Sequence, residues 1–473
     1  MRIVQNSVLT VVSLAIIAEA LSGRAALIST SDFSSSDIIY RDVCIVGGGA
    51  SGTYGAIRLH DMGKSIVIVE RNPVLGGQTE TYTDPVSNNK TEMGVVAWYD
   101  IVIVNNFFNR LNVTLATTDV ARAGSAALTT LPVDFRTGKV VTNVFSGNVT
   151  EGLVNYATQL AKYPYLEDGF DLPYPVPADL LLPFGDFIKK YKISGAVQTL
   201  NIFGNGMGNF LEQTTLYVFK LVSMATIQAL EQGTFQATAD HKNDQVYINA
   251  QAELGDNVLL SSRVVDVDRS DSPVKVVVKT PSGLKLIIAK KLLLSIPPKL
   301  DNLVGFDLDP NEVSAFSQIT SAGYYTAVIN NTGIDGHIEV RNFGADSPYN
   351  VPVLPGPYFV QASAITGLFT VKYCTPHPVG DASAKASIIA NVQRLRSAGT
   401  LNTTTPEFVA FHSHAPFSMT VSVEAIQDGF YKNLSALQGY KETYWTGAAF
   451  HTQDSSKLWQ FTEKLLPTIT DRL

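Results

Sequence analysis

Cysteine is scarce in this sequence. Only Cys44 and Cys374 occur among 473 residues. Two cysteines exclude a disulfide-rich scaffold, a CxxC redox pair and a structural zinc site built on thiolates. We expect Cys44 to be an inert thiol, because it lies in an apolar run typical of a buried strand. The nearby histidines His412 and His414 have no third ligand close in sequence, so no metal site is expected.

Charge is also scarce, and there is no run of lysine or arginine. Charged residues make up 16% of the sequence, and the formal net charge is −7. This composition lacks the basic footprint of a protein that binds nucleic acid. Hydrophobic residues make up 45% of the chain, enough to build full cores. The length predicts two domains.

Long apolar stretches are missing beyond the N-terminus. Arg2 precedes an apolar run over residues 8–18, and Ala18-Glu19-Ala20 has the small-x-small pattern of a signal-peptidase site. The run is too short to span a bilayer, which takes about 20 apolar residues. We therefore predict a signal peptide over residues 1–20, a protein that is secreted or enters the lumen of the secretory pathway, and no stable membrane insertion.

Six Asn-x-Ser/Thr sequons follow the predicted signal peptide. They lie in polar, turn-like stretches and are expected glycosylation sites of a secreted chain. The six asparagines are Asn89, Asn112, Asn148, Asn330, Asn402 and Asn433.

A glycine-rich loop carries the strongest chemical signal. The apolar run 42–46 is typical of a buried parallel strand, and a helix is expected over 53–62. Between them stands Gly47-Gly48-Gly49-Ala50-Ser51-Gly52. A second apolar run, 66–69, ends at Glu70. Strand, loop, helix, strand and acid in this order predict a dinucleotide-binding unit.

Each part of this unit has a physical role. The three glycines of the G-x-G-x-x-G pattern allow a tight turn, a close approach of backbone to pyrophosphate, and close packing of helix on strand. The helix N-terminus faces the phosphates, and Glu70 accepts hydrogen bonds from a ribose. The expected contacts in the loop are Gly47, Gly49, Ala50, Ser51 and Gly52.

The residues after Glu70 favour FAD over NAD. A di-glycine at this distance is typical of flavin enzymes, in which the loop runs back along the cofactor. No second G-x-G-x-x-G follows a strand, and the glycine-rich stretch 204–208 is predicted to be a loop because no strand precedes it. We therefore predict FAD, with further contacts from Arg71, Gly76, Gly77 and Gln78.

Later segments are expected to return to this unit. Residues 257–267 are predicted as paired strands, 274–279 as another strand, and 292–298 as the segment that closes the unit. A last strand near 443–447 precedes a helix over 454–466, with Asp454 as its cap and Pro467 as its end. A longer helical stretch is predicted over 211–231.

These segments resemble the fungal β-cyclopiazonate dehydrogenase family, within the flavin amine oxidase superfamily. The resemblance spans about 42–466 and is loose over about 107–234. The motifs that carry it are Gly76-Gly77-Gln78-Thr79-Glu80-Thr81-Tyr82, Met93-Gly94-Val95, Leu437-Gln438-Gly439 and Tyr444-Trp445-Thr446-Gly447. It implies a secreted FAD enzyme that performs an oxidative ring closure. It also adds Gly94, Val264 and Gly447 to the cofactor contacts, with Val264 at the adenine.

Two departures from the family patterns matter. Gln78 stands where the family usually has histidine, and an amide cannot hold a proton at neutral pH. Amine oxidases carry a lysine on the strand after the Pro-Pro turn, whereas this chain has Gly323-Tyr324-Tyr325-Thr326-Ala327 there. Ordinary amine oxidation is therefore disfavoured.

The predicted fold is α/β, with a discontinuous, amine oxidase-like FAD-binding domain of Rossmann type and an α+β substrate domain. The FAD-binding domain is expected over 40–100, 240–300 and 430–473, and the substrate domain over 101–239 and 301–429. A small hydrophobic substrate would bind between them. Candidate pocket residues are His414, Tyr444 and His451.

The function predicted from these features is FAD-dependent removal of a hydride from a C–H bond of a hydrophobic small molecule. Two alternatives stay open: a flavin-dependent isomerase of double bonds in polyenoic fatty acids, and an FAD-fold protein that binds without catalysis.

Overall fold

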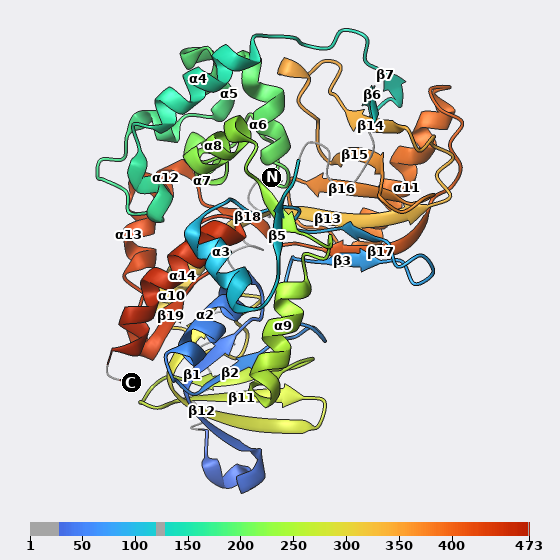
Figure 1. Cartoon of the computed structure of the whole chain (residues 1–473). Helices are drawn as coiled ribbons and strands as arrows, with labels where there is room; N and C mark the ends of the chain where they lie inside the picture. Colours follow the sequence, from blue (N-terminus) through green and yellow to red (C-terminus); the bar gives the residue numbers. More distant parts are fainter. Residues whose placement is uncertain (1–27, 120–127, 472) are drawn as a thin grey trace, which may run out of the picture.

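The computed structural model describes residues 28–119, 128–471 and 473. The predicted signal peptide therefore lies outside the described residues. Within them, the strands form two large sheets, one of seven strands and one of eight, and two small ribbons. Figure 1 shows the seven-stranded sheet at the bottom, the eight-stranded sheet at the upper right and a group of helices at the upper left.

The seven-stranded sheet is built around the predicted glycine-loop unit. Its order is β10-β11-β12-β1-β2-β9, with β19 beside β12. The central pairs β12–β1 and β1–β2 are parallel, and β2 is buried throughout, as both-sided burial of a parallel sheet requires. The strands are β1 (Ile38–Val46), β2 (Ile66–Val69), β9 (Val258–Leu259), β10 (Arg263–Asp268), β11 (Val274–Thr280), β12 (Gly283–Leu294) and β19 (Thr443–Trp445).

Four helices cover one face of this sheet: α2 (Ala50–Asp61), α3 (Val102–Arg110), α9 (Gln245–Leu254) and α14 (Ser455–Thr470). Their core is aromatic, with Trp459 fully buried between Tyr54, Trp98 and Phe107. Residues of α3 and Val113, which follow the expected domain limit at residue 100, pack in this core.

The eight-stranded sheet has the order β17-β13-β16-β15-β14-β6-β7, with β18 beside β13. Helix α11 (Asp381–Ser397) packs on one face, over an apolar cluster that includes Val371 and Tyr373 of β16. We call the opposite face the inner face. The strands are β6 (Thr129–Asp134), β7 (Lys139–Val140), β13 (Thr320–Asn330), β14 (Ile338–Asn342), β15 (Gly356–Ala362), β16 (Phe369–Thr375), β17 (Glu407–Ser413) and β18 (Phe417–Thr420).

The remaining helices and ribbons connect the two sheets. The helices are α4 (Val149–Leu160), α5 (Phe184–Tyr191), α6 (Val197–Phe203), α7 (Thr215–Leu221), α8 (Met224–Gln232), α10 (Pro310–Phe316), α12 (Val423–Gln427) and α13 (Phe430–Ser435). The ribbons are β3 (Thr81–Thr83) with β4 (Lys90–Glu92), and β5 (Leu115–Thr117) with β8 (Gln236–Thr238). Among the described residues, none of the helices has the length and apolar character needed to cross a bilayer.

Three predicted elements differ from the structure. The strands of 257–267 do not pair with each other: β9 pairs with β2 and β10 with β11, at opposite edges of the sheet. The stretch 211–231 contains two helices, because Val222 leaves the helical conformation at ψ 71° and Ser223 caps α8. Asp454 caps α14 as expected, but the helix contains Pro467 and ends at Thr470.

Candidate active site

The glycine loop adopts the predicted strand–turn–helix geometry. Gly47 has φ +100°, and a Cβ on Gly52 would lie 2.0 Å from the carbonyl oxygen of Gly47. Helix α2 begins after Gly49, three residues earlier than expected, and Gly49 offers no side chain to cap it. Ser51 Oγ is buried at this helix end without a hydrogen-bond partner. Free N–H groups and an orphan hydroxyl at a helix N-terminus suit a pyrophosphate.

Glu70 stands where the prediction placed the ribose acceptor. Its buried carboxylate accepts hydrogen bonds from the backbone N–H of Gly48, at 2.6 Å, and of Asn72, at 2.8 Å. The acid is thereby held against the loop at the end of β2. Arg71 is exposed beside it, and Val264 is half-buried on β10.

The di-glycine loop packs directly on the glycine loop. The N–H of Gly76 donates to the carbonyl of Gly48 at 2.9 Å. Gly77 has φ +59°, and a Cβ there would lie 2.8 Å from the Cα of Gly49. A Cβ on Gly94 would lie 1.8 Å from the carbonyl oxygen of Gln78. Backbone therefore touches backbone where the prediction placed cofactor contacts, which only glycine permits.

The turn after the last strand has a backbone conformation that favours glycine. Gly447 has φ +102°, and a Cβ there would lie 3.3 Å from the carbonyl oxygen of Ser295. The N–H of Thr446 donates to the carbonyl of Leu294 at 2.9 Å. This joins the end of β19 to the end of β12, next to the glycine loop.

The inner face of the eight-stranded sheet meets the di-glycine loop through a carboxylate and two histidines. Glu80 contacts His412 Nδ1 at 2.7 Å and His414 Nε2 at 3.1 Å, and Gln78 Nε2 donates to the carbonyl of His414 at 3.1 Å. Burial raises the pKa of Glu80, but its hydrogen bonds to the two histidines outweigh burial and the net pKa is lowered. His414, a candidate pocket residue, thus lies beside the di-glycine loop, and its acidic partner Glu80 was not foreseen.

Three neighbouring strands carry a row of polar side chains on the inner face. Thr326 of β13 pairs directly with Lys372 of β16 and with His412 of β17. Glu92 comes from β4, where Thr81 and the backbone N–H of Asn243 donate to its carboxylate. Burial raises the pKa of Glu92 to about 8 and lowers that of Lys372 to about 8. Sequence reasoning missed Lys372 and Glu92.

A small cavity opens beyond the Gly447 turn. His451 lines it, and Nε2 of this residue lies 2.9 Å from the carbonyl oxygen of Glu167. A carbonyl only accepts, so Nε2 carries the proton, and the buried Nδ1 is an acceptor without a partner. Burial, and then the charge of Lys220, lowers the pKa of His451. The lining residues are Phe170, Met207, Tyr217, Lys220, Ser418, Met419, Ala448, His451, Thr452 and Gln453.

Tyr444 lies in the core, not in this cavity. Its hydroxyl donates to the carbonyl of Thr468 at 2.9 Å, and its ring packs in the cluster under α14. The adjacent Trp445 points to the other side of the strand and packs against Phe316. Both residues are therefore structural, because both faces of β19 are covered.

The sequon asparagines differ in exposure. Five are exposed: Asn89, Asn112, Asn148, Asn402 and Asn433. Asn330 is half-buried at the end of β13, and its Oδ1 is buried. The expected turn-like setting is wrong for Asn330, which lies in a strand, and for Asn433, which lies in helix α13.

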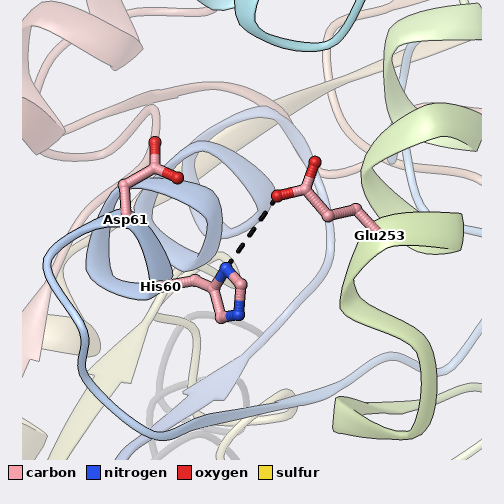
Figure 2. Close-up of side chains that lie close together, drawn as sticks. All are labelled: His60, Asp61 and Glu253. Atoms are coloured by element: carbon pink, nitrogen blue, oxygen red, sulfur yellow. Dashed lines mark ion pairs between the residues drawn. The ribbon is translucent and has the colours of Figure 1, made fainter.

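A group of metal-ligand residue types lies on the surface of the seven-stranded unit. Figure 2 shows His60 and Asp61 of α2 facing Glu253 of α9. The guanidinium of Arg110 donates to Asp61 at 2.6 Å and to Glu253 at 2.9 Å, so both carboxylates already have a cation. We interpret the group as an exposed ion-pair network that joins α2, α3 and α9.

Known proteins match this chain over most of its length. A family model for FAD dependent oxidoreductase matches residues 42–159. An FAD-dependent oxidoreductase, oblC, of Cochliobolus heterostrophus is 40% identical over 92% of this chain and 92% of its own. β-Cyclopiazonate dehydrogenase of Aspergillus oryzae is 35% identical over 94% of this chain and 96% of its own. The chain belongs to this family of fungal FAD-dependent oxidoreductases. The predicted enzyme class and cofactor are thereby confirmed.

Solved structures confirm the fold of this FAD-dependent oxidoreductase. A fatty acid isomerase from P. acnes superimposes with a TM-score of 0.72 over 91% of this chain and 99% of its own, at 18% identity. Putrescine oxidase, an amine oxidase, shares the fold at a TM-score of 0.62. The residues of the glycine loops fit FAD, because Ser51 and the helix end leave polar groups unpaired while glycine keeps the backbone accessible.

Proposed function

We propose that this enzyme oxidises a hydrophobic secondary metabolite at a C–H bond, and that the oxidation leads to ring closure. Relatives at 35–40% identity support an oxidoreductase, and one of them is a β-cyclopiazonate dehydrogenase. FAD, when bound, supplies the group that accepts a hydride from carbon. The chain itself must then orient the substrate and accept the proton that ring closure releases.

The observation that carries the proposal is the unpartnered Nδ1 of His451. Its lowered pKa keeps the imidazole neutral, and the bond from Nε2 to Glu167 fixes which nitrogen is free. A neutral imidazole nitrogen without a partner can accept a proton. His451 lines a cavity of about 10 Å³, the size of a single water site, together with Phe170, Tyr217 and two methionines.

The surrounding groups hold His451 in place. Lys220 donates to the carbonyls of Leu166 and Gly169, at 2.6 and 2.8 Å, and lies over the ring of Phe170. These contacts fix the segment that contains Glu167. We infer that Lys220 is a positioning residue, because two of its donors bind the backbone and its Nζ also lies 3.4 Å from Nε2 of His451.

We also propose that the enzyme is secreted. The predicted signal peptide supports this, and so do the five exposed sequon asparagines. Expression of the full chain in a fungal host should give a glycosylated protein in the medium. Protein retained in the cells without glycan would contradict secretion.

The test of the oxidation is an anaerobic absorption spectrum of the FAD-loaded protein. We expect β-cyclopiazonate or a related indole compound to bleach the flavin bands. His451→Gln should slow bleaching by about 100-fold or more, the usual effect of losing a general base. His60→Gln, which changes an exposed histidine far from the cavity, should bleach like the wild type.

Two results would contradict the proposed oxidation. Product formed from linoleate while the flavin stays oxidised would indicate the isomerase. A protein that binds FAD but leaves every candidate unchanged would indicate a binding function.

A further inference from the structure

Lys372 is a cation without a partner on the inner face. Along β16, Val371 and Tyr373 point toward α11, so Lys372 and its neighbour Cys374 point to the opposite, inner face. The side chain is half-buried, and it makes no hydrogen bond or ion pair with any residue that the structure describes. An ammonium group on a partly buried face without a carboxylate partner is available to a bound anion.

The charged side chains around Lys372 bind other residues. Both oxygens of Glu92 accept hydrogen bonds, from Asn243 and Thr81, and this carboxylate lies too far from Lys372 for an ion pair. Glu80 is held by the two histidines. On the same face of β14, Arg341 is paired with Glu339 at 2.7 Å. The remaining titratable neighbours are Tyr324, Tyr358 and Cys374, whose pKa values burial raises.

A second polar group beside Lys372 also lacks a partner. The hydroxyl of Thr326 is buried without a hydrogen bond, and Thr326 stands directly opposite Lys372 in the ladder. Directly paired residues on one face have Cβ atoms about 5 Å apart. The two residues therefore start from neighbouring positions on the inner face, and an ammonium and a hydroxyl are both donors suited to a negatively charged oxygen.

We propose that Lys372 binds an anionic oxygen of the substrate, a carboxylate or an enolate, and so selects acidic hydrophobic molecules. This rests on the proposed function only in that the bound molecule is the one oxidised. The inner face meets the di-glycine loop through Glu80 and Gln78, so an oxygen held at Lys372 places the attached carbon skeleton beside the cofactor segments. Lys372 then sets orientation, and His451 accepts the proton.

The test measures preference for a charged over an uncharged probe. Indole-3-acetate and indole-3-acetamide have nearly the same shape, and the acetate is ionised between pH 6 and pH 10. Each is titrated into the FAD-loaded protein at pH 7, with perturbation of the flavin spectrum and calorimetry as readouts. We expect the wild type to bind the acetate about 10- to 100-fold more tightly, the value of a hydrogen bond to a charged group.

Variants assign this preference to Lys372. Lys372→Met should abolish the preference, Lys372→Arg should retain most of it, and Lys279→Met, which removes an exposed strand lysine, should leave it unchanged. In the wild type the preference should fall as pH rises past about 8, where Lys372 loses its charge. Glu92 gains charge over the same range, so the fall should persist in Glu92→Gln.

The outcomes separate this proposal from the proposed function. A Lys372→Met protein that keeps the preference, or a wild type that shows none, overturns the anion site. If Lys372→Met fails to retain FAD, the Lys372→Arg variant and the pH profile of the wild type test the anion site instead. A preference that is lost in Lys372→Arg, or that does not fall above about pH 8 in the wild type, overturns it. A Lys372-dependent preference in an enzyme that oxidises nothing supports the site while the proposed function fails.

Discussion

Two cationic side chains, one on each large sheet, differ in their ion-pair partners and in the direction of their pKa shifts. Arg269 follows β10 of the seven-stranded sheet with a fully buried side chain. It bonds to Glu312 at 2.7 and 2.8 Å and to Asp307 at 2.6 Å. Burial opposes its charge, but the hydrogen bonds to Glu312 outweigh burial and the pKa of Arg269 is raised. Lys372 on the eight-stranded sheet has no such partner, and its pKa is lowered.

Unpaired polar groups occur on both sides of the molecule. On the seven-stranded side, Glu70 is bonded to the glycine loop and Arg269 is paired with two carboxylates, but the hydroxyl of Ser51 has no partner. On the inner face and in the cavity, Thr326 Oγ1 and His451 Nδ1 have no partner among the described residues. Unsatisfied buried groups are rare in folded proteins, and a bound cofactor or substrate would give these groups their partners.

The largest effect is expected at the glycine loop, where the backbone packs too closely to admit a side chain. In Gly52→Ala the new Cβ would lie 2.0 Å from the carbonyl oxygen of Gly47, and backbone cannot move aside cheaply. We expect loss of FAD from the purified protein, measured by the ratio of flavin to protein absorbance. Gly380→Ala is the matched control, because Gly380 stands at the N-terminus of helix α11 and nothing lies within 4 Å of its Cβ position. Full FAD content in Gly52→Ala would show that the loop is less constrained than its geometry indicates.

The next prediction compares the two cations directly. Arg269→Met leaves Glu312 buried without its partner, which should lower the free energy of unfolding by about 3–5 kcal/mol. Lys372→Met removes a charge that has no partner, so its stability should stay within about 1 kcal/mol of the wild type. Urea unfolding of both FAD-loaded variants measures the difference. Equal losses of unfolding free energy in the two variants would contradict the inference that Arg269 has a structural partner and Lys372 has none.

The same contrast explains how far the sequence could predict the site. The glycine-loop unit is built from residues that are close in sequence, so the segment from Gly47 to Glu70 could be placed from spacing alone. The end of β2 was predicted correctly at Val69. The inner face depends on strand pairing between distant segments. Lys372 meets Thr326 only through an antiparallel register that no local pattern contains.

Two weaker expectations failed for related reasons. Tyr444 was expected in the pocket because strand side chains alternate, but α14 covers the face to which it points. Pro467 was expected to end the last helix, yet packing of Leu466 and Ile469 carries the helix to Thr470. Tertiary packing overrides local preference at both positions.

The last prediction concerns the pH dependence of stability that is due to Glu92. The pKa of Glu92 is raised to about 8 in the folded chain, above its usual value of 4.5. Between these values the folded state holds a proton that the unfolded state has released, so the stability due to this group is lost as pH rises from 5 to 8. We expect Glu92→Gln to remove most of this loss of stability over pH 5–8. Glu231→Gln, at an exposed site on α8, should follow the wild type. Parallel stability curves for the wild type and Glu92→Gln would mean that Glu92 is ionised in the fold and that its burial does not hold the proton.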